Sequence, residues 1–200
     1  MSTRFMLVRH ATCARTASVL LGRGVDAPLD AQGERQARAV ATQLAAFAPL
    51  VVWSSPRRRA RQTAEAIAAA AACPLRESRD IDEVDFGDWC GCSFDELDVL
   101  PEWRRWNADR EHARTPAGDS VTKVRARALR LMDVIARGEG ADATVVLVTH
   151  AEVIRTVLLH ALQRPPGDFL HFDLPPASVT RIDLCGSHWS VRPLDERVAA

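Results

Sequence analysis

Short runs that are almost entirely apolar alternate along this chain with longer amphipathic segments. Three such runs lie at residues 5–8, 50–53 and 144–148. A strand that is apolar throughout suits a sheet covered on both faces, whereas a half-exposed strand alternates apolar and polar residues. Helices between such strands favour parallel pairing, because a parallel connection must cross over the sheet. The sequence therefore predicts an α/β fold with a mainly parallel central sheet and helices on both faces.

The segments between these runs have helical periodicity. Asp30 is placed to cap a helix, and one face of that helix carries Ala37, Val40, Ala41 and Leu44. The remaining expected elements are helices at 57–72, 121–136 and 151–162, short helices around 94–97 and 102–109, strands at 179–184 and 189–192, and a loop-rich stretch at 80–89. No repeat or low-complexity linker interrupts the 200 residues, so we expect a single domain over residues 1–200.

Composition excludes several classes of protein. The chain is 47% hydrophobic and 26% charged, as soluble proteins are, and its formal net charge of zero argues against nucleic-acid binding through phosphate neutralisation. Neither the first apolar run nor the alanine tract at 68–72 is long enough for a signal peptide or a membrane span. The five cysteines are odd in number and scattered, which favours reduced thiols. We therefore expect a cytoplasmic protein that binds neither nucleic acid nor membrane.

Two of the predicted strands end on a histidine. Arg9 and His10 follow the first run directly, and His150 follows the run at 144–148. Open α/β sheets place their sites just beyond the carboxyl ends of strands, so the two histidines are expected to share one site. A lone histidine is more often structural or solvated, but two at equivalent strand ends favour a function.

A series of motifs resembles those of the histidine phosphatase superfamily, branch 1, which is also called phosphoglycerate mutase-like. In chain order they are Arg9-His10-Ala11, Asp26-Ala27-Pro28-Leu29 with Gly33, Ser54-Ser55-Pro56 with Arg59, Ala60 and Thr63, Glu83 with Phe86-Gly87 and Trp89, Gly118-Asp119-Ser120, and Val148-Thr149-His150. One Arg-His-Gly-like triplet is a weak signal, but this ordered set over nearly the whole chain is specific. The resemblance implies a three-layer sandwich, with a helical cap or insertion at about 90–117.

The residue types in these motifs suit phosphoryl transfer. Arg9 and Arg59 can clamp the oxygens of a phosphomonoester and neutralise charge that Mg²⁺ neutralises in many phosphotransferases. The resemblance implies that His10 is the nucleophile, which forms a phosphohistidine, and that Glu83 is the proton donor and acceptor. It also implies that His150 stabilises charge on the transferring group. No metal or other cofactor is expected.

The remaining expected phosphate contacts are less specific, and the chain departs from the family pattern near them. Thr16 could offer a hydroxyl and Ala151 a backbone N–H. Cys90 replaces the Glu that commonly follows the Trp of the acid-bearing loop, and Ala151-Glu152 replaces a Gly-Gly pair. A carboxylate at Glu152 would repel phosphate unless it points away or contacts substrate.

The expected function is metal-independent hydrolysis of a small phosphorylated metabolite, which releases inorganic phosphate. Two alternatives stay open: a cofactor-dependent mutase of the phosphoglycerate mutase type, and a non-catalytic phosphate-binding protein on the same fold. Mutases of the family are typically longer and carry Asn-Ser where this chain has Glu152-Val153. Intact Arg9, His10 and the other motif residues argue against a non-catalytic protein.

Substrate recognition is expected from the loop after His10 and from the cap at 90–117. That segment contains Trp103, Trp106, Arg104, Arg105 and Arg110. Two interpretations stay open: these side chains contact substrate, or they form an amphipathic cap whose tryptophans pack inward and whose arginines face water. A sugar phosphate, a nucleotide and a cobalamin-precursor phosphate are all compatible with the sequence.

Overall fold

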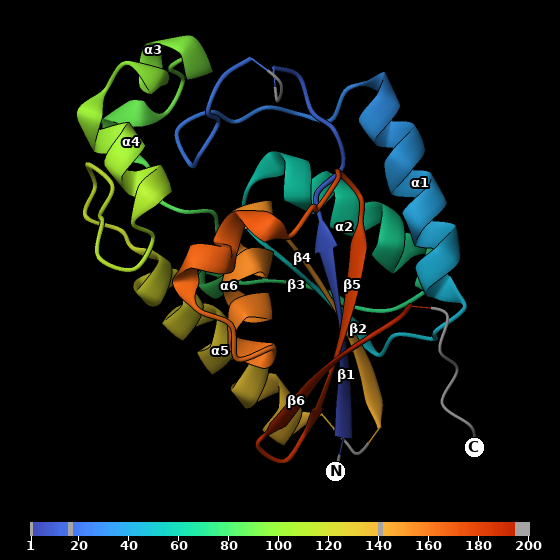
Figure 1. Cartoon of the computed structure of the whole chain (residues 1–200). Coiled ribbons are helices and arrows are strands. Elements are labelled where there is room, and N and C mark those ends of the chain that lie inside the picture. Colours follow the sequence, from blue (N-terminus) through green and yellow to red (C-terminus); the bar gives the residue numbers. More distant parts are fainter. Residues whose placement is uncertain (1, 16–17, 140–141, 195–200) are drawn as a thin grey trace.

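A six-stranded sheet runs through the centre of the computed structural model, which describes residues 2–15, 18–139 and 142–194 (Figure 1). The strands are β1 Ser2–Arg9, β2 Val51–Ser54, β3 Leu75–Glu77, β4 Ala143–Thr149, β5 Val179–Cys185 and β6 His188–Arg192. Their order in the sheet is β3-β2-β4-β1-β5-β6. The first four in that order pair in parallel, whereas β5 runs antiparallel to both β1 and β6. The prediction of a mainly parallel sheet is confirmed.

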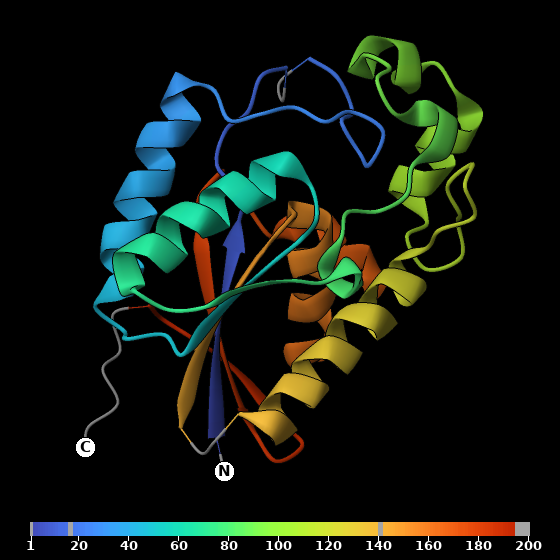
Figure 2. The ribbon, with the colours of Figure 1, turned by 180° about the vertical axis from the view of Figure 1, so that it is seen from behind.

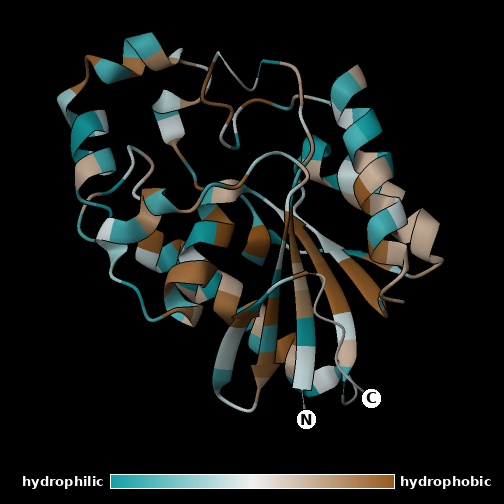
Figure 3. Cartoon of the chain, turned by 45° about the vertical axis from the view of Figure 1, so that its right-hand side comes forward, coloured by the Kyte–Doolittle hydropathy of each residue, from teal (hydrophilic) through white to brown (hydrophobic). Residues whose placement is uncertain are grey.

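Four long helices cover the two faces of this sheet (Figures 1 and 2). They are α1 Ala31–Ala45 and α2 Arg58–Ala71 on one face, and α5 Val121–Gly138 and α6 Ala151–Ala161 on the other. Successive strand residues point to opposite faces, so Met6 and Val8 pack with α1 and α2 while Phe5 and Leu7 pack with α5 and α6. The middle of the sheet is accordingly hydrophobic (Figure 3), and the three-layer arrangement is confirmed.

The start of α1 shows how the sequence fixes one element close to the strand ends. Asp30 is the N-cap, and its Oδ1 accepts a hydrogen bond from the Gly33 N–H at 2.8 Å, as expected for a capping aspartate. A Cβ at Gly33 would lie 1.8 Å from the carbonyl oxygen of Thr12, which only glycine avoids. Gly33 thus lets α1 pack directly against the loop that follows His10.

Two short helices, α3 Phe94–Asp98 and α4 Pro101–Ala108, lie beyond the carboxyl ends of the strands (Figure 1). Trp103 and Trp106 are buried, and Arg104 and Arg105 are exposed, as in the interpretation of an amphipathic cap. Arg110 departs from that interpretation, because only 6% of it is exposed. Three 3-10 turns complete the described elements: Arg79–Ile81, Gly87–Trp89 and Pro166–His171.

The sequence did not predict β3 or the turn Pro166–His171. All three residues of β3 are exposed, so this edge strand has no apolar pattern and forms through main-chain pairing with β2. No helix within the described residues has the length and hydropathy that a membrane crossing requires.

Candidate active site

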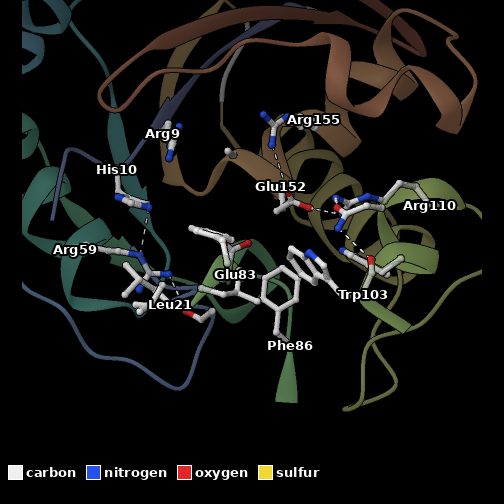
Figure 4. Close-up of a pocket in the computed structure, with 17 residues that line it drawn as sticks. Arg9, His10, Leu21, Arg59, Glu83, Phe86, Trp103, Arg110, Glu152 and Arg155 are labelled. Carbon is white, nitrogen blue, oxygen red and sulfur yellow. Dashed lines mark hydrogen bonds and ion pairs between the residues drawn. The ribbon is translucent and has the colours of Figure 1, made fainter. Parts of the chain in front are cut away.

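The carboxyl ends of β1, β2 and β4 meet at one edge of the sheet, where a cavity of about 290 Å³ opens (Figure 4). The expected site residues Arg9, His10, Arg59, Glu83 and Ala151 all line it. His150 is fully buried next to them, with its ring centroid 5.2 Å from that of His10. Thr16, the remaining expected phosphate contact, lies outside the described residues. The structure therefore gathers residues from four separate stretches of the sequence: 9–10, 59, 83 and 150–151.

The His10 imidazole is held in one tautomer. Its Nδ1 lies 2.8 Å from the carbonyl oxygen of Ala11, which can only accept, so Nδ1 carries the proton and Nε2 is left with a lone pair. Burial, and then the charge of Arg59, lower the pKa of His10 to about 3. The imidazole is therefore neutral at neutral pH, and its Nε2 is unprotonated.

Arg59 joins the two histidines to the loop that borders the cavity. Its Nε lies 3.2 Å from His10 Nε2, and its second terminal nitrogen lies 3.3 Å from His150 Nδ1 and 2.8 Å from the carbonyl oxygen of Gly22. Gly22 has a φ of +52°, and a Cβ there would lie 2.5 Å from Cys90 Sγ. Cys90, which departs from the family pattern, thus packs against a glycine loop whose carbonyl Arg59 holds.

His150 is oriented by a chain of buried polar groups. Ser55 Oγ lies 2.8 Å from His150 Nε2 and donates to Asp82 Oδ1 at 3.1 Å. The serine hydroxyl has one proton and gives it to the carboxylate, so it accepts the Nε2–H of His150. The lone pair of Nδ1 then faces Arg59. Burial and the charge of Arg59 hold the pKa of His150 well below its ordinary value, so this imidazole is neutral at neutral pH.

Glu83 is fixed through its backbone and has an unusual acidity. Its carbonyl oxygen accepts from Arg23 Nε at 2.7 Å and from Arg127 at 3.0 Å, and its Oε2 lies 3.5 Å from His150 Nδ1. Burial raises the pKa of Glu83 to about 7; Glu152 adds to the rise and Arg59 opposes it. A carboxyl group with such a pKa can both give and take a proton near neutral pH.

Arg9 reaches the same space from the end of β1. One terminal nitrogen donates to the carbonyl oxygen of Leu174, and burial lowers the pKa of the guanidinium. Figure 4 shows Arg9 and Arg59 on either side of His10, which is the arrangement needed to bind an anion in front of the imidazole. Over the described part of the chain, no group of three or more His, Cys, Asp or Glu side chains is placed to hold a metal ion.

Glu152 points into the cavity at the end away from His10 (Figure 4). Its two carboxylate oxygens pair with Arg110 at 2.8 Å and with Arg155 at 3.0 Å. Sequence reasoning did not identify these pairs, nor the contacts of Ser55 with His150 and with Asp82. The pair of Glu152 with Arg155 could have been found from the sequence, because Arg155 lies one helical turn after Glu152. The pair with Arg110 could not, because Arg110 lies in the distant segment 90–117.

Fold and site together define an α/β protein with two histidines and two arginines at a cavity beside the strand ends. The chain belongs to the histidine phosphatase superfamily, branch 1, whose family model matches residues 5–196. The resemblance stated from the motifs is thereby confirmed.

Known proteins extend this comparison. The chain is 36% identical over 201 residues to the Bifunctional protein Rv2228c of Mycobacterium tuberculosis, covering 97% of this chain but 54% of that protein. It is 30% identical over 170 residues to a glucosyl-3-phosphoglycerate phosphatase of Mycolicibacterium vanbaalenii, covering 81% of this chain and 75% of that one. The solved structure of mycobacterial glucosyl-3-phosphoglycerate phosphatase Rv2419c with VO3 matches with a TM-score of 0.85 and 27% identity, covering 98% and 99% of the two chains. This chain thus spans about half the length of the first of these relatives.

Replacing Arg59 with alanine is expected to weaken the binding of phosphate or vanadate by about 1.5–3 kcal/mol, the loss typical of a charge-assisted hydrogen-bonding partner. Competitive inhibition constants measure this loss, and thermal unfolding shows whether the variant stays folded without the contact to Gly22. Arg61→Ala is the matched control, because Arg61 is exposed and pairs with the surface carboxylates of Glu65 and Glu77. Equal losses in both variants would indicate a diffuse basic patch instead of a clamp.

Proposed function

We propose that this protein is a metal-independent phosphomonoesterase that acts on a small phosphorylated metabolite through a phosphohistidine on Nε2 of His10. The observation that carries the proposal is the unprotonated Nε2 of a buried, neutral His10, 3.2 Å from the guanidinium of Arg59. A histidine is nucleophilic only through such a lone pair, and the hydrogen bond from Nδ1 to Ala11 keeps the pair on the nitrogen that faces the cavity.

In the first step the phosphate dianion binds between Arg9 and Arg59, which neutralise its charge and allow Nε2 to approach. Nε2 attacks phosphorus, the bond from phosphorus to the ester oxygen breaks, and Glu83 gives its proton to the leaving oxygen. His150, whose ring centroid lies 5.2 Å from that of His10, stabilises charge on the transferring group, because the bound dianion favours its protonated form.

In the second step the ionised Glu83 takes a proton from water, and the oxygen of that water attacks the phosphohistidine. The phosphorus–nitrogen bond breaks, inorganic phosphate leaves, and His10 regains its lone pair. One carboxyl group with a pKa of about 7 suits both steps, because it donates in the first and accepts in the second.

The size and the lining of the cavity favour a small molecule as the substrate. Its volume of about 290 Å³ and its aromatic side chains Phe86, Trp103 and Trp106 suit a metabolite with some apolar surface. The relative that acts on glucosyl-3-phosphoglycerate is consistent with a phosphorylated metabolite of this kind. The five scattered cysteines favour a cytoplasmic location. The formal net charge of zero argues against nucleic acid as a partner, and no membrane partner is expected. The ligands are then the substrate and inorganic phosphate.

The two alternatives are less well supported by the site. A mutase must hold a second phosphate while the first is on the histidine, but the carboxylate of Glu152 occupies the opposite end of the cavity. A non-catalytic binding protein would not need a carboxyl group whose pKa is raised to about 7 next to a neutral imidazole.

Purified protein is expected to release inorganic phosphate from one or more members of a panel of phosphomonoesters, at the same rate with and without EDTA. The reason is that Arg9 and Arg59 supply the charge that a metal would otherwise supply. Loss of activity on chelation would contradict the metal-independent mechanism. Transfer of phosphate between esters without release would instead identify a mutase.

A further inference from the structure

The cavity has two ends with different charge. At one end Arg9 and Arg59 face His10, and their two positive charges match a phosphate dianion. At the other end lie Arg110, Glu152 and Arg155 (Figure 4), where two cations and one carboxylate leave a single net positive charge among the described lining residues. The alcohol part of a phosphomonoester that is bound at His10 extends towards this second end.

Aromatic rings and hydrogen bonds hold the Arg110 side chain in place. Its guanidinium carbon lies 4.7 Å from the ring centroids of both Trp106 and Phe169, and it donates to Asn107 Oδ1 at 2.6 Å. Its Nε is buried and has no partner within the described stretches. A guanidinium held in this way cannot swing out of the cavity, so its charge remains at the second end.

Glu152 neutralises part of the positive charge at the second end of the cavity. Its Oε2 lies 2.8 Å from Arg110 and its Oε1 lies 3.0 Å from Arg155, so each carboxylate oxygen occupies one terminal nitrogen of an arginine. The negative charge of Glu152 also contributes to the raised pKa of Glu83, after the larger effect of burial. A second dianion at the far end would have to displace this carboxylate or lie against it, and like charges a few ångström apart repel strongly.

We propose that Glu152 determines the charge of the alcohol part that the cavity accepts: neutral or singly negative groups bind, and a second phosphate is rejected. This inference rests on the proposed phosphatase function. It identifies Glu152 as a specificity-determining residue that favours monophosphates over bisphosphates, and it assigns a role to one of the positions at which this chain departs from the family pattern.

Three ligands with the same carbon skeleton test the proposal: glycerol 3-phosphate, 3-phosphoglycerate and glycerol 1,3-bisphosphate, whose alcohol parts carry no, one and two negative charges. Their inhibition constants are measured against hydrolysis of p-nitrophenyl phosphate. For the wild type we expect the bisphosphate to bind about tenfold more weakly than 3-phosphoglycerate, and for Glu152→Gln we expect this preference to disappear or reverse.

Two further variants separate charge from other effects. Glu152→Asp keeps the negative charge and is expected to keep the preference. Glu102→Gln makes the same change of charge on the exposed face of α4, outside the cavity, and is expected to leave the ratio of inhibition constants unchanged. Thermal unfolding confirms that each variant is folded.

Several outcomes would overturn the role of Glu152: equal binding of the bisphosphate and 3-phosphoglycerate by the wild type, an unchanged ratio in Glu152→Gln, or the same shift in Glu102→Gln. Failure of the wild type to hydrolyse p-nitrophenyl phosphate and every other member of the phosphomonoester panel would instead contradict the proposed function. The same three ligands would then be compared by calorimetry on the unmodified protein, which would turn none of them over.

Discussion

His10→Ala is expected to reduce hydrolysis of every phosphomonoester by at least about 10³-fold, because the variant has no side chain that can form the covalent intermediate. Acid-labile phosphate trapped on the protein should disappear together with turnover. Phosphate or vanadate should still bind, since Arg9 and Arg59 remain. Quenched-flow trapping with labelled substrate measures the intermediate, and steady-state kinetics measures the rate.

His188→Ala is the matched control, because His188 is exposed at the start of β6. It should leave both the rate and the trapped phosphate unchanged. Full activity in His10→Ala, or a normal amount of trapped phosphate in it, would contradict the assignment of His10 as nucleophile.

The same variant has a consequence for stability. Burial and Arg59 lower the pKa of His10 from its ordinary 6.5 to about 3, so between these pH values the unfolded chain binds a proton that the folded chain does not. Stability associated with His10 is therefore present above pH 6.5 and is lost as the pH falls towards 3. His10→Ala should lose less stability than the wild type over that acid range, as denaturant titrations at several pH values would show.

Glu83→Gln is expected to slow formation of the phosphoenzyme from alkyl phosphates by about 10²–10⁴-fold, the range typical of general acid catalysis. Nitrophenyl phosphate should be affected less, because nitrophenolate leaves without a proton. Single-turnover measurements are needed, because Glu83 also serves as the base in the second step and would hide the contrast in steady-state rates.

A pH profile provides a second measurement of the same role. The acid must be protonated, and the pKa of Glu83 is raised to about 7, so phosphoenzyme formation from alkyl phosphates should fall as the pH rises through 7. Glu83→Gln should lack this limb of the profile. A uniform loss across leaving groups, with the limb retained, would remove Glu83 from the role of the acid.

Asp85→Asn is the suitable control for this experiment. Asp85 lies two residues from Glu83, and its partly exposed carboxylate contacts Arg23 at 3.5 Å. Asp82→Asn is not suitable, because Asp82 Oδ1 accepts from Ser55, which in turn orients His150. A dependence on the leaving group in Asp85→Asn equal to that in Glu83→Gln would indicate a general charge effect.

Much of the fold could be predicted because its signals are local. The apolar runs at 5–8, 50–53 and 144–148 became β1, β2 and β4, and Asp30 capped α1 as expected. Each of these elements buries enough apolar surface to leave a signal in the sequence, which is a continuous apolar run for the strands and a helical periodicity for α1. The strand β3 left no such signal in the sequence, because its side chains are exposed and it joins the sheet through main-chain pairing with β2.

The residues of the candidate site could also be located from the sequence. Arg9, His10 and His150 follow predicted strands, and strand ends in a parallel sheet meet at one edge. Family motifs added Arg59 and Glu83, which have no local signal of their own. The structure brings all five together; Thr16 lies outside its described part.

Only the tertiary structure decided the chemical state of these groups. The pKa and the tautomer of a side chain depend on its burial and on its neighbours, and here the neighbours come from distant segments. Ser55, held by Asp82, orients His150. Arg59 helps to keep both imidazoles neutral. The charge at the far end of the cavity depends in the same way on Arg110, which lies 42 residues before Glu152. The sequence by itself determined which side chains reach the strand ends; the fold decided their protonation, because the contacts that set it join segments that no local pattern relates.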